Sequence, residues 1–446
     1  MDLSFDQNHL EYNEFETDIL HIPVEKPPNV HNDEILFSDP GQDIHLAGYL
    51  RLESFWGSDK ERYIVVQGTK LKIFIDSSDE VPKHSFSLEN CNIRLEANDK
   101  LKLIFGDSNF TFTSEEKNLF QWLVRLNNCI KAAQYLMKSY LDNQTPSRLI
   151  LTLLRDDEIC FRERISLCNQ ELTKSAQFFL FSAFEYWNFN ELELCNIGLT
   201  CETLSHLSNC MNKNLTKLSV VGNNLTVDAG AILSSMLKNS SIVSLDLSDN
   251  PAITDVGFED IIDILSTNNR PMSLLNVSNC GITSKCMQTL LDSALEAQSW
   301  DHNIVITTLN LSHASFDTKA MQSLHYFLRN QAVHVSDLIM THSLTNKEVS
   351  EAFISRLSRT LKLFRLDIRN SELSVSAVNS LGEVVQSHPN LKEVMFNPGD
   401  KDPVAAEALV SYISPDSYEF ELIFQNDRMK STISDKTKEI INQYCE

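Results

Sequence analysis

Two hydrophobic periodicities divide the chain into two regions with different predicted structures. Between residues 44 and 141, short segments alternate apolar and polar residues, as in HLAGYLRL at 45–52 and LKLIF at 101–105. Alternation of this kind predicts strands that bury one face. The expected strands cover 45–52, 62–66, 71–75, 83–88, 91–95, 101–105 and 110–112. Apolar residues then recur at helical spacing from 119 to 130, so the pattern predicts an antiparallel β-barrel closed by one amphipathic helix.

A longer repeat organises the second region. The string LLNVSNCGI at 274–282 matches the leucine-rich pattern L-x-L-x-x-N/C-x-L, and segments starting at 192, 218, 245, 309, 338, 366 and 394 align with it. Helix-like stretches lie between these strings, for example at 201–211 and 375–385. One strand and one helix per repeat of about 26–34 residues predict an α/β leucine-rich-repeat solenoid, or horseshoe.

The repeat pattern assigns expected roles to individual residues. Asn223, Asn250 and Cys280 occupy the position that turns the chain and hydrogen-bonds the neighbouring coil, so we expect them to be structural. Residues between the leucines are expected on the concave face of the sheet. This face is the candidate protein-binding surface. The alternative is a solvent-exposed sheet face that binds no partner. The candidates are Glu193, Lys217, Ser219, Asp246, Asn276, Asn310, Asp337, Arg365, Asp367, Arg369 and Glu393.

Three marks in the first region resemble the pleckstrin-homology (PH) domain. They are Gly48-Tyr49-Leu50, the segment KERYIVV at 60–66 and the single Trp122 in the last helix. The resemblance implies weak binding of a phosphoinositide headgroup by Lys60 and Arg62, which match the family's Lys-x-Arg pattern on the second strand. Leu52 stands where strong lipid binders carry a lysine, so a domain that binds protein, or no ligand, is the alternative.

The order of the two regions carries a further resemblance. A PH-like domain followed by ribonuclease-inhibitor-like leucine-rich repeats is similar to the N-terminal half of the CARMIL family of actin regulators. That similarity implies a scaffold at a membrane or the actin cortex. The expected partner is a protein, either cytoskeletal or, as for other repeats of this subclass, a small GTPase. The expected divisions are an acidic, disordered leader at 1–43, a PH-like domain at 44–141, a helical linker and repeat cap at 142–190, about eight repeats at 191–425 and a polar C-terminal helix or tail at 426–446.

The charge distribution excludes some functions. The chain has 38 basic and 61 acidic residues, and hence a net charge of −23. Eleven acidic residues against one basic residue fall in 1–43, whereas 44–141 holds thirteen basic and twelve acidic residues. This balance argues against a nucleic-acid partner, because phosphate binding requires clustered Lys and Arg. The near-neutral first region also weakens the case for strong electrostatic membrane binding.

The chain shows no sign of secretion or of a membrane span. Its start lacks the basic and apolar segments of a signal peptide, and no apolar run approaches the ~18 residues that a span needs. Ten cysteines without CxxC pairs are expected to be reduced thiols. We therefore expect a cytoplasmic protein, with peripheral association at the plasma membrane or cell cortex left open.

No catalytic motif accompanies these modules. The sequence contains no Gly-rich phosphate loop, HExxH, GxSxG or zinc-spaced Cys/His set, so we expect neither an enzyme nor a metal or cofactor. The leading hypothesis is a non-enzymatic adaptor that binds a protein partner through the concave face of the repeats. One alternative is a leucine-rich-repeat protein that activates or regulates a GTPase. The other is a purely cytosolic protein-binding module without lipid affinity.

Overall fold

The computed structural model describes residues 44–53, 59–96, 100–106, 108–113, 119–156, 162–267 and 270–395. The expected leader at 1–43, the repeat end at 396–425 and the tail at 426–446 lie outside the described residues. The chain divides into two compact units, Met1–Phe120 and Gln121–Glu446. Each unit is considered by itself.

The first unit is a seven-stranded antiparallel sheet. Its strands lie in the order β4-β3-β2-β1-β7-β6-β5, so the first and last strands of the unit pair with each other. The elements are β1 (Ile44–Leu52), β2 (Lys60–Gln67), β3 (Lys70–Phe74), β4 (His84–Ser87), the short helix η1 (Leu88–Asn90), β5 (Cys91–Leu95), β6 (Lys100–Phe105) and β7 (Ser108–Thr113). Every predicted strand is present, and the topology resembles a PH-like fold.

Alternation along the strands builds the core of this unit. On β2, Ile64 and Val66 are fully buried, and so are Leu71 and Ile73 on the neighbouring β3. Tyr63 and Val65 point to the opposite face, where they pack with Ala47 in a smaller cluster. Both faces of β2 are therefore covered, because successive side chains of a strand alternate between the two faces.

The second unit is a repeating strand–helix solenoid. Nine strands, β8 to β16, form one parallel sheet in sequence order, as expected when each repeat pairs only with its neighbours. The strands are β8 (Arg164–Cys168), β9 (Glu191–Cys195), β10 (Lys217–Ser219), β11 (Ser244–Asp246), β12 (Met272–Asn276), β13 (Ile304–Asn310), β14 (Val333–Ile339), β15 (Arg365–Asp367) and β16 (Glu393–Met395). This topology confirms the predicted leucine-rich-repeat solenoid.

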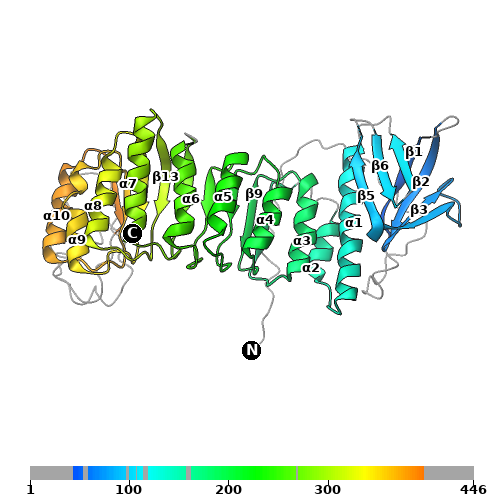
Figure 1. Ribbon diagram of the computed structural model, residues 1–446, viewed down its shortest axis with the longest axis horizontal. Helices are drawn as coiled ribbons and strands as arrows, with labels where there is room; N and C mark the ends of the chain where they lie inside the picture. The colour runs from blue at the N-terminus through cyan, green and yellow to red at the C-terminus, as the bar shows by residue number, and fades with distance from the viewer. Residues whose placement is uncertain are drawn as a thin grey trace, which may run out of the picture. The chain divides into compact units, whose positions relative to one another are not determined.

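Helices alternate with these strands and cover one face of the sheet (Figure 1). After α1 (Leu119–Leu141) and α2 (Arg148–Arg155) they follow one another along the solenoid. They are α3 (Lys174–Ala183) with η3 (Phe184–Tyr186), α4 (Cys201–Cys210), α5 (Ala229–Asn239), α6 (Thr254–Thr267), α7 (Ser284–Ser299), α8 (Thr318–Arg329), α9 (Lys347–Ile354) with η4 (Leu357–Arg359), and α10 (Val375–Ser387).

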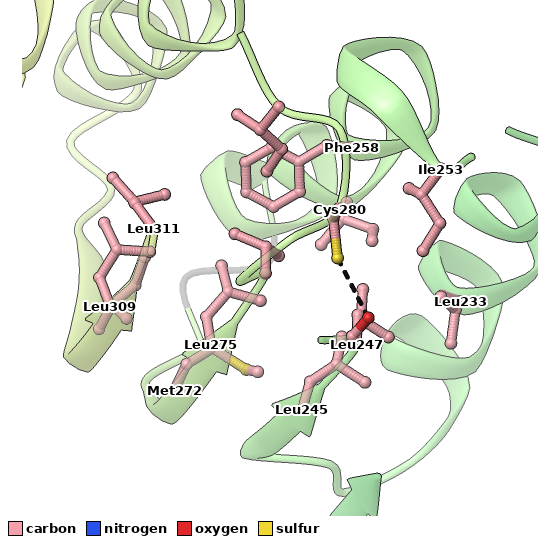
Figure 2. Packing of buried hydrophobic residues seen from close by; sticks show 14 of the residues in the cluster. Leu233, Leu245, Leu247, Ile253, Phe258, Met272, Leu275, Cys280, Leu309 and Leu311 are labelled. Carbon is pink, nitrogen blue, oxygen red and sulfur yellow. Dashed lines mark hydrogen bonds between the residues drawn. The ribbon is translucent and has the colours of Figure 1, made fainter. Parts of the chain in front are cut away.

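The repeat leucines form one continuous core between the sheet and the helices. Leu245, Leu275 and Leu309 are in register on β11, β12 and β13 and are fully buried. Figure 2 labels them together with Phe258 of α6, which belongs to the same buried cluster. Stacking of this kind buries each repeat against the next, so the stability of one repeat depends on its neighbours.

The start of the solenoid differs from the expected helical linker and cap. β8 lies inside the predicted 142–190 segment and pairs in register with β9, so the sheet begins one strand earlier than the eight repeats found by pattern. Phe181, Phe184 and Trp187 are buried in the core there, whereas Phe178 is exposed.

Helix α1, expected as the last element of the first module, belongs to the second unit beyond Phe120, and its Val124, Ala132 and Tyr135 are part of the second unit's core.

Side-chain caps fix where many of the helices begin. Thr200 of α4 forms a capping box with Thr203, and Asp317 of α8 accepts the backbone N–H of Ala320 at 2.7 Å. Such caps satisfy N–H groups that the first helical turn leaves without an intrahelical partner. Further side-chain caps are Thr173, Thr283, Asn346 and Ser374.

Candidate functional site

The candidate residues lie on the face of the parallel sheet opposite the helices, which we call the open face. Its side chains form two rows, because parallel strands in register place equivalent residues side by side. The central row is Ser166, Glu193, Ser219, Asp246, Asn276, Asn310, Ile339, Asp367 and Met395. The flanking row is Arg164, Glu191, Lys217, Ser244, Leu274, Thr308, Asp337, Arg365 and Glu393.

At its N-terminal end the open face carries two cross-strand ion pairs. The Arg164 guanidinium donates to both oxygens of Glu193, at 2.7 and 2.8 Å, and the Ser166 hydroxyl donates to the same carboxylate at 2.8 Å. Lys217 Nζ lies 2.6 Å from Glu191 Oε1. The Arg164 and Lys217 side chains are 59% and 56% exposed, about twice as exposed as their partners. We call these four charged residues the N-terminal charge patch.

These contacts control the ionisation of Glu193. Partial burial opposes the charged form of its carboxyl group, but the hydrogen bonds from Arg164 and Ser166 outweigh that cost and hold the pKa below its usual value. The same contact with Glu193 raises the pKa of Arg164. Both groups are charged at neutral pH, and the cation is the more exposed of the two.

A second group of charges lies at the C-terminal end of the described sheet. Arg365 Nε donates to Glu393 Oε2 at 2.5 Å, and its guanidinium is 3.9 Å from Asp337. Arg369 donates through Nε and a terminal nitrogen to Asp367, at 2.9 and 2.6 Å. We call these five residues the C-terminal charge patch. Asp367 is only 2% exposed, so loss of the Arg369 cation would leave its carboxylate buried without a charged partner.

Four candidates of the central row also form hydrogen bonds within their own loop. Each accepts the backbone N–H two residues further on: Asp246 from Ser248 at 3.0 Å, Asn276 from Ser278 at 3.1 Å, Asn310 from Ser312 at 3.0 Å and Asp367 from Arg369 at 3.1 Å. Such Asx turns end the strand and fix the following loop. The recurring spacing Asp/Asn-x-Ser at 246, 276 and 310 is the sequence signal for this role, which we did not predict.

The three structural candidates connect neighbouring repeats through the buried backbone. Asn223 accepts the N–H groups of Ile197 and Leu199 at 3.0 and 3.1 Å, and Asn250 accepts those of Asn223 and Leu225 at 3.0 Å each. Sγ of Cys280 lies 3.1 Å from the Leu247 carbonyl oxygen (Figure 2), and burial raises the pKa of this thiol to about 12. Cys280 therefore acts as a buried donor rather than as a nucleophile.

Sequence reasoning missed a further member of this series. Ser343 is completely buried, and its hydroxyl donates to the Leu311 carbonyl oxygen at 2.8 Å and accepts the N–H of Ala314 at 3.2 Å. The signal was its position, five residues after Leu338, where the pattern has Asn or Cys. A hydroxyl can replace the amide there because it both donates and accepts.

The lipid-headgroup candidates lie at the beginning of β2 in the first unit. Lys60 pairs in register with Leu52 and Arg62 with Leu50. Residues 60, 62, 64 and 66 alternate along the strand, so both cations lie on the same face of β2 as the buried Ile64 and Val66. Arg51 pairs with Glu61 and therefore lies on the opposite face of the sheet from Lys60 and Arg62. The cation pair thus lacks a third basic residue beside it on β1, and the connection at 54–58 lies outside the described residues.

Comparison with known proteins identifies the modules. A family model described as "Leucine Rich repeat" matches residues 238–261, which include β11 and most of α6. The chain carries a PH-like domain followed by leucine-rich repeats. It is 28% identical over 181 residues to mouse (Mus musculus) "NACHT, LRR and PYD domains-containing protein 14", and 32% identical over 122 residues to zebrafish (Danio rerio) "Tonsoku-like protein". These matches cover 40% and 27% of this chain but only 16% and 8% of the relatives.

Solved structures similar to the N-terminal region are PH domains. One is the human PH domain of TBC1 domain family member 2, with 18% identity, a TM-score of 0.19, and coverage of 23% of this chain and 87% of that one. Another is the C-terminal PH domain of pleckstrin, with 17% identity, a TM-score of 0.18, and coverage of 21% and 98%. These likenesses concern the fold alone. The chain therefore combines a domain of PH-like fold with leucine-rich repeats.

Within the described part of the chain, no helix has the length and apolar character to cross a membrane. The same residues contain no group of three or more His, Cys, Asp or Glu side chains placed to hold a metal ion.

Proposed function

We propose that this protein is a non-enzymatic adaptor that binds a protein partner through the open face of its leucine-rich repeats. One observation carries the proposal: the most exposed charges of that face, on Arg164, Lys217 and Arg365, stand in two ion-paired patches at its two ends. Between the patches, the flanking row is uncharged at Ser244, Leu274 and Thr308.

The spacing of the patches favours a folded partner or a helix over a small ligand. Lys217 on β10 and Arg365 on β15 are five strand spacings apart, which is about 24 Å at ~4.8 Å per spacing. A helix of about 16 residues has this length. The exposed cations would meet partner carboxylates, and Glu191, Asp337 and Glu393 would meet partner cations. Complementarity of this kind sets specificity and association rate more than affinity.

The decisive experiment is affinity capture with charge-removing variants of the full chain. The open-face variant combines Arg164→Ala, Lys217→Ala and Arg365→Ala. The matched control is Lys174→Ala with Lys285→Ala, because both lysines are 60% exposed and ion-paired but lie on α3 and α7. A partner that the control retains and the open-face variant loses supports the proposal. Equal recovery by both variants would contradict it, and a captured GTPase whose hydrolysis accelerates would favour the GTPase-regulator alternative.

We propose further that the PH-like domain places the adaptor at a membrane or the actin cortex, using Lys60 and Arg62 for weak phosphoinositide contact. The shared face of these two cations supports this role, although two bases supply only about 1 kcal/mol each near an anionic surface. Flotation with phosphoinositide vesicles tests it. Lys60→Glu with Arg62→Glu should abolish flotation, whereas Lys70→Glu with Lys72→Glu on β3 should keep at least part of it. Equal flotation of the wild type and the first variant would leave the domain as a protein-binding module.

A further inference from the structure

Two cysteines lie side by side at the carboxyl ends of the first two strands of the solenoid. Cys168 ends β8 and Cys195 ends β9, and they are in-register partners. Parallel neighbours are separated by about 4.8 Å, which falls inside the range of roughly 4.4–6.8 Å that a disulfide allows between Cα atoms. Cys168 is exposed and Cys195 half-buried, unlike the buried Cys280 and Cys286.

Cross-strand contacts hold this pair in place on both sides. Two residues earlier, on the same sheet face, the Ser166 hydroxyl bonds the Glu193 carboxylate at 2.8 Å, so side chains of this face do meet across the two strands. Just beyond the pair, the Asn169 N–H donates to the Cys195 carbonyl oxygen at 2.8 Å, and the Asn196 amide donates to the Asn169 side chain at 2.9 Å. The backbone therefore has little freedom to separate the two cysteines.

The two thiols also influence each other electrostatically. Burial raises the pKa of the Cys195 thiol, a hydrogen bond with Ser219 lowers it, and the adjacent Cys168 thiol raises it again. Sγ of Cys168 is 3.5 Å from the Ser166 hydroxyl, and Sγ of Cys195 is 3.6 Å from the Ser219 hydroxyl. Neither sulfur is locked in a buried bond, so either can rotate toward the other.

We propose that Cys168 and Cys195 form a two-thiol modification site, which a peroxide oxidises to a cross-strand disulfide and which chelates trivalent arsenicals when reduced. The exposed Cys168 thiolate attacks the O–O bond of hydrogen peroxide, giving a sulfenic acid and hydroxide. Cys195 then attacks this sulfur; the S–S bond forms as the S–O bond breaks, and water leaves with the Cys195 proton. The two sulfurs lose two electrons in total, and the peroxide accepts them.

Peroxide oxidation of the reduced full chain tests the proposal directly. After alkylation of the remaining thiols, mass mapping of non-reduced peptides should find the 168–195 link as the first disulfide formed, and dithiothreitol should reverse it. Cys168→Ser and Cys195→Ser should each abolish the link. Cys201→Ser and Cys210→Ser, which remove half-buried thiols from α4, should leave it unchanged. A link from Cys168 to Cys160 or Cys445, or no link while other thiols oxidise, would overturn the proposal.

Phenylarsine oxide provides a test that needs no oxidant. Two thiols replace its oxygen with two S–As bonds and release one water, so a proximal pair binds one reagent and loses two free thiols. We expect one tight equivalent per wild-type chain, at least tenfold weaker binding in either Cys→Ser variant, and wild-type binding in the α4 controls. Thermal unfolding of each variant should stay near that of the wild type, which separates loss of the site from loss of the fold. Equal binding by all variants would overturn the proposal.

Discussion

At the scale of single residues, buried amides connect one repeat to the next. Asn250 is completely buried and accepts the N–H groups of Asn223 and Leu225. Its amide nitrogen also contacts three carbonyl oxygens, those of Leu247 at 2.7 Å, Val220 at 3.0 Å and Ser248 at 3.2 Å. Its side chain thus satisfies backbone groups of two neighbouring loops. Without it these groups would be buried and unpaired, which costs about 1–3 kcal/mol each.

We therefore expect Asn250→Ala to lower the free energy of unfolding by about 3–5 kcal/mol. Urea denaturation of the full chain measures this loss. Asn239→Ala is the control, because Asn239 is exposed at the end of α5 and donates only to Ser235 at 3.3 Å. Its effect should stay within about 0.5 kcal/mol. Similar midpoints for the two variants would show that the amide ladder contributes little.

The two arginines of the C-terminal charge patch should behave differently. Arg369→Ala leaves the Asp367 carboxylate buried without its cation, so it should cost about 3–5 kcal/mol. Arg365→Ala removes a partly exposed pair with Glu393 and should cost at most about 1 kcal/mol. Adding Asp367→Asn to Arg369→Ala should restore most of the loss, because the buried group is then neutral. A double variant no more stable than Arg369→Ala alone would count against this explanation.

His325 gives the repeats a defined pH dependence. The side chain is buried on α8, and its pKa is lowered to about 4 by burial and by the nearby cations Arg329, Arg356 and Arg359. The unfolded chain protonates near pH 6.5, so protonation favours unfolding. This contribution is complete above pH 6.5 and is lost as the pH falls toward 4, by about 3 kcal/mol. Denaturation from pH 7 to 4 should show a shallower loss for His325→Gln, and parallel curves would contradict this assignment.

At the scale of elements, helices α5 and α6 approach unusually closely at two glycines. A Cβ added to Gly230 would lie 2.1 Å from the Gly257 carbonyl oxygen, a backbone atom that cannot move aside without shifting α6. Gly→Ala within a helix ordinarily stabilises by about 1 kcal/mol. Here the sign should reverse, because the overlap must separate two packed helices.

We expect Gly230→Ala to destabilise the chain by about 1–3 kcal/mol. Ser235→Ala on the exposed face of α5 is the control and should be neutral or slightly stabilising. Thermal unfolding of both variants measures the difference. A stabilised Gly230→Ala variant would show that the two helices can separate at little cost.

The pattern of leucines predicted eight strands because their spacing is local and regular, but it missed β8. There the string ISLCNQEL at 165–172 has Ile for the first leucine and Gln170 at the Asn position. The ion pairs of the open face were beyond sequence reasoning for another reason. Arg164 and Glu193 are 29 residues apart, and only the register of β8 with β9 brings them together. The Asp/Asn-x-Ser spacing at Asp246 and Asn276 is a local signal for a turn. The same residues also fit the pattern of a binding face, so the sequence alone does not separate the two roles.

At the scale of the whole molecule, α1 decides where the repeat unit begins. Trp187 Nε1, buried in the core, donates to Asn128 Oδ1 of α1 at 2.9 Å, and the Tyr135 hydroxyl accepts the N–H of Ser147 at 2.8 Å. Val124, Ala132 and Tyr135 belong to the repeat core. The sequence pattern predicted a boundary after residue 141, because this helix completes a PH-like pattern. Its contacts with Trp187 and the repeat core instead make it a cap of the solenoid.

Truncation separates these two boundaries. A fragment of residues 121–446 keeps the α1 contacts and should unfold cooperatively, whereas a fragment of 142–446 exposes the core around Trp187 and leaves its indole N–H without Asn128. Loss of this hydrogen bond and of the apolar contacts should cost at least about 3 kcal/mol. Asn128→Ala in the longer fragment removes the acceptor of this hydrogen bond but keeps the Trp187 ring, and should cost about 1–3 kcal/mol. A terminal cap must cover the core that the first repeat leaves open, so its removal should lower the urea midpoint. Equal midpoints for the two fragments would show that α1 is not this cap.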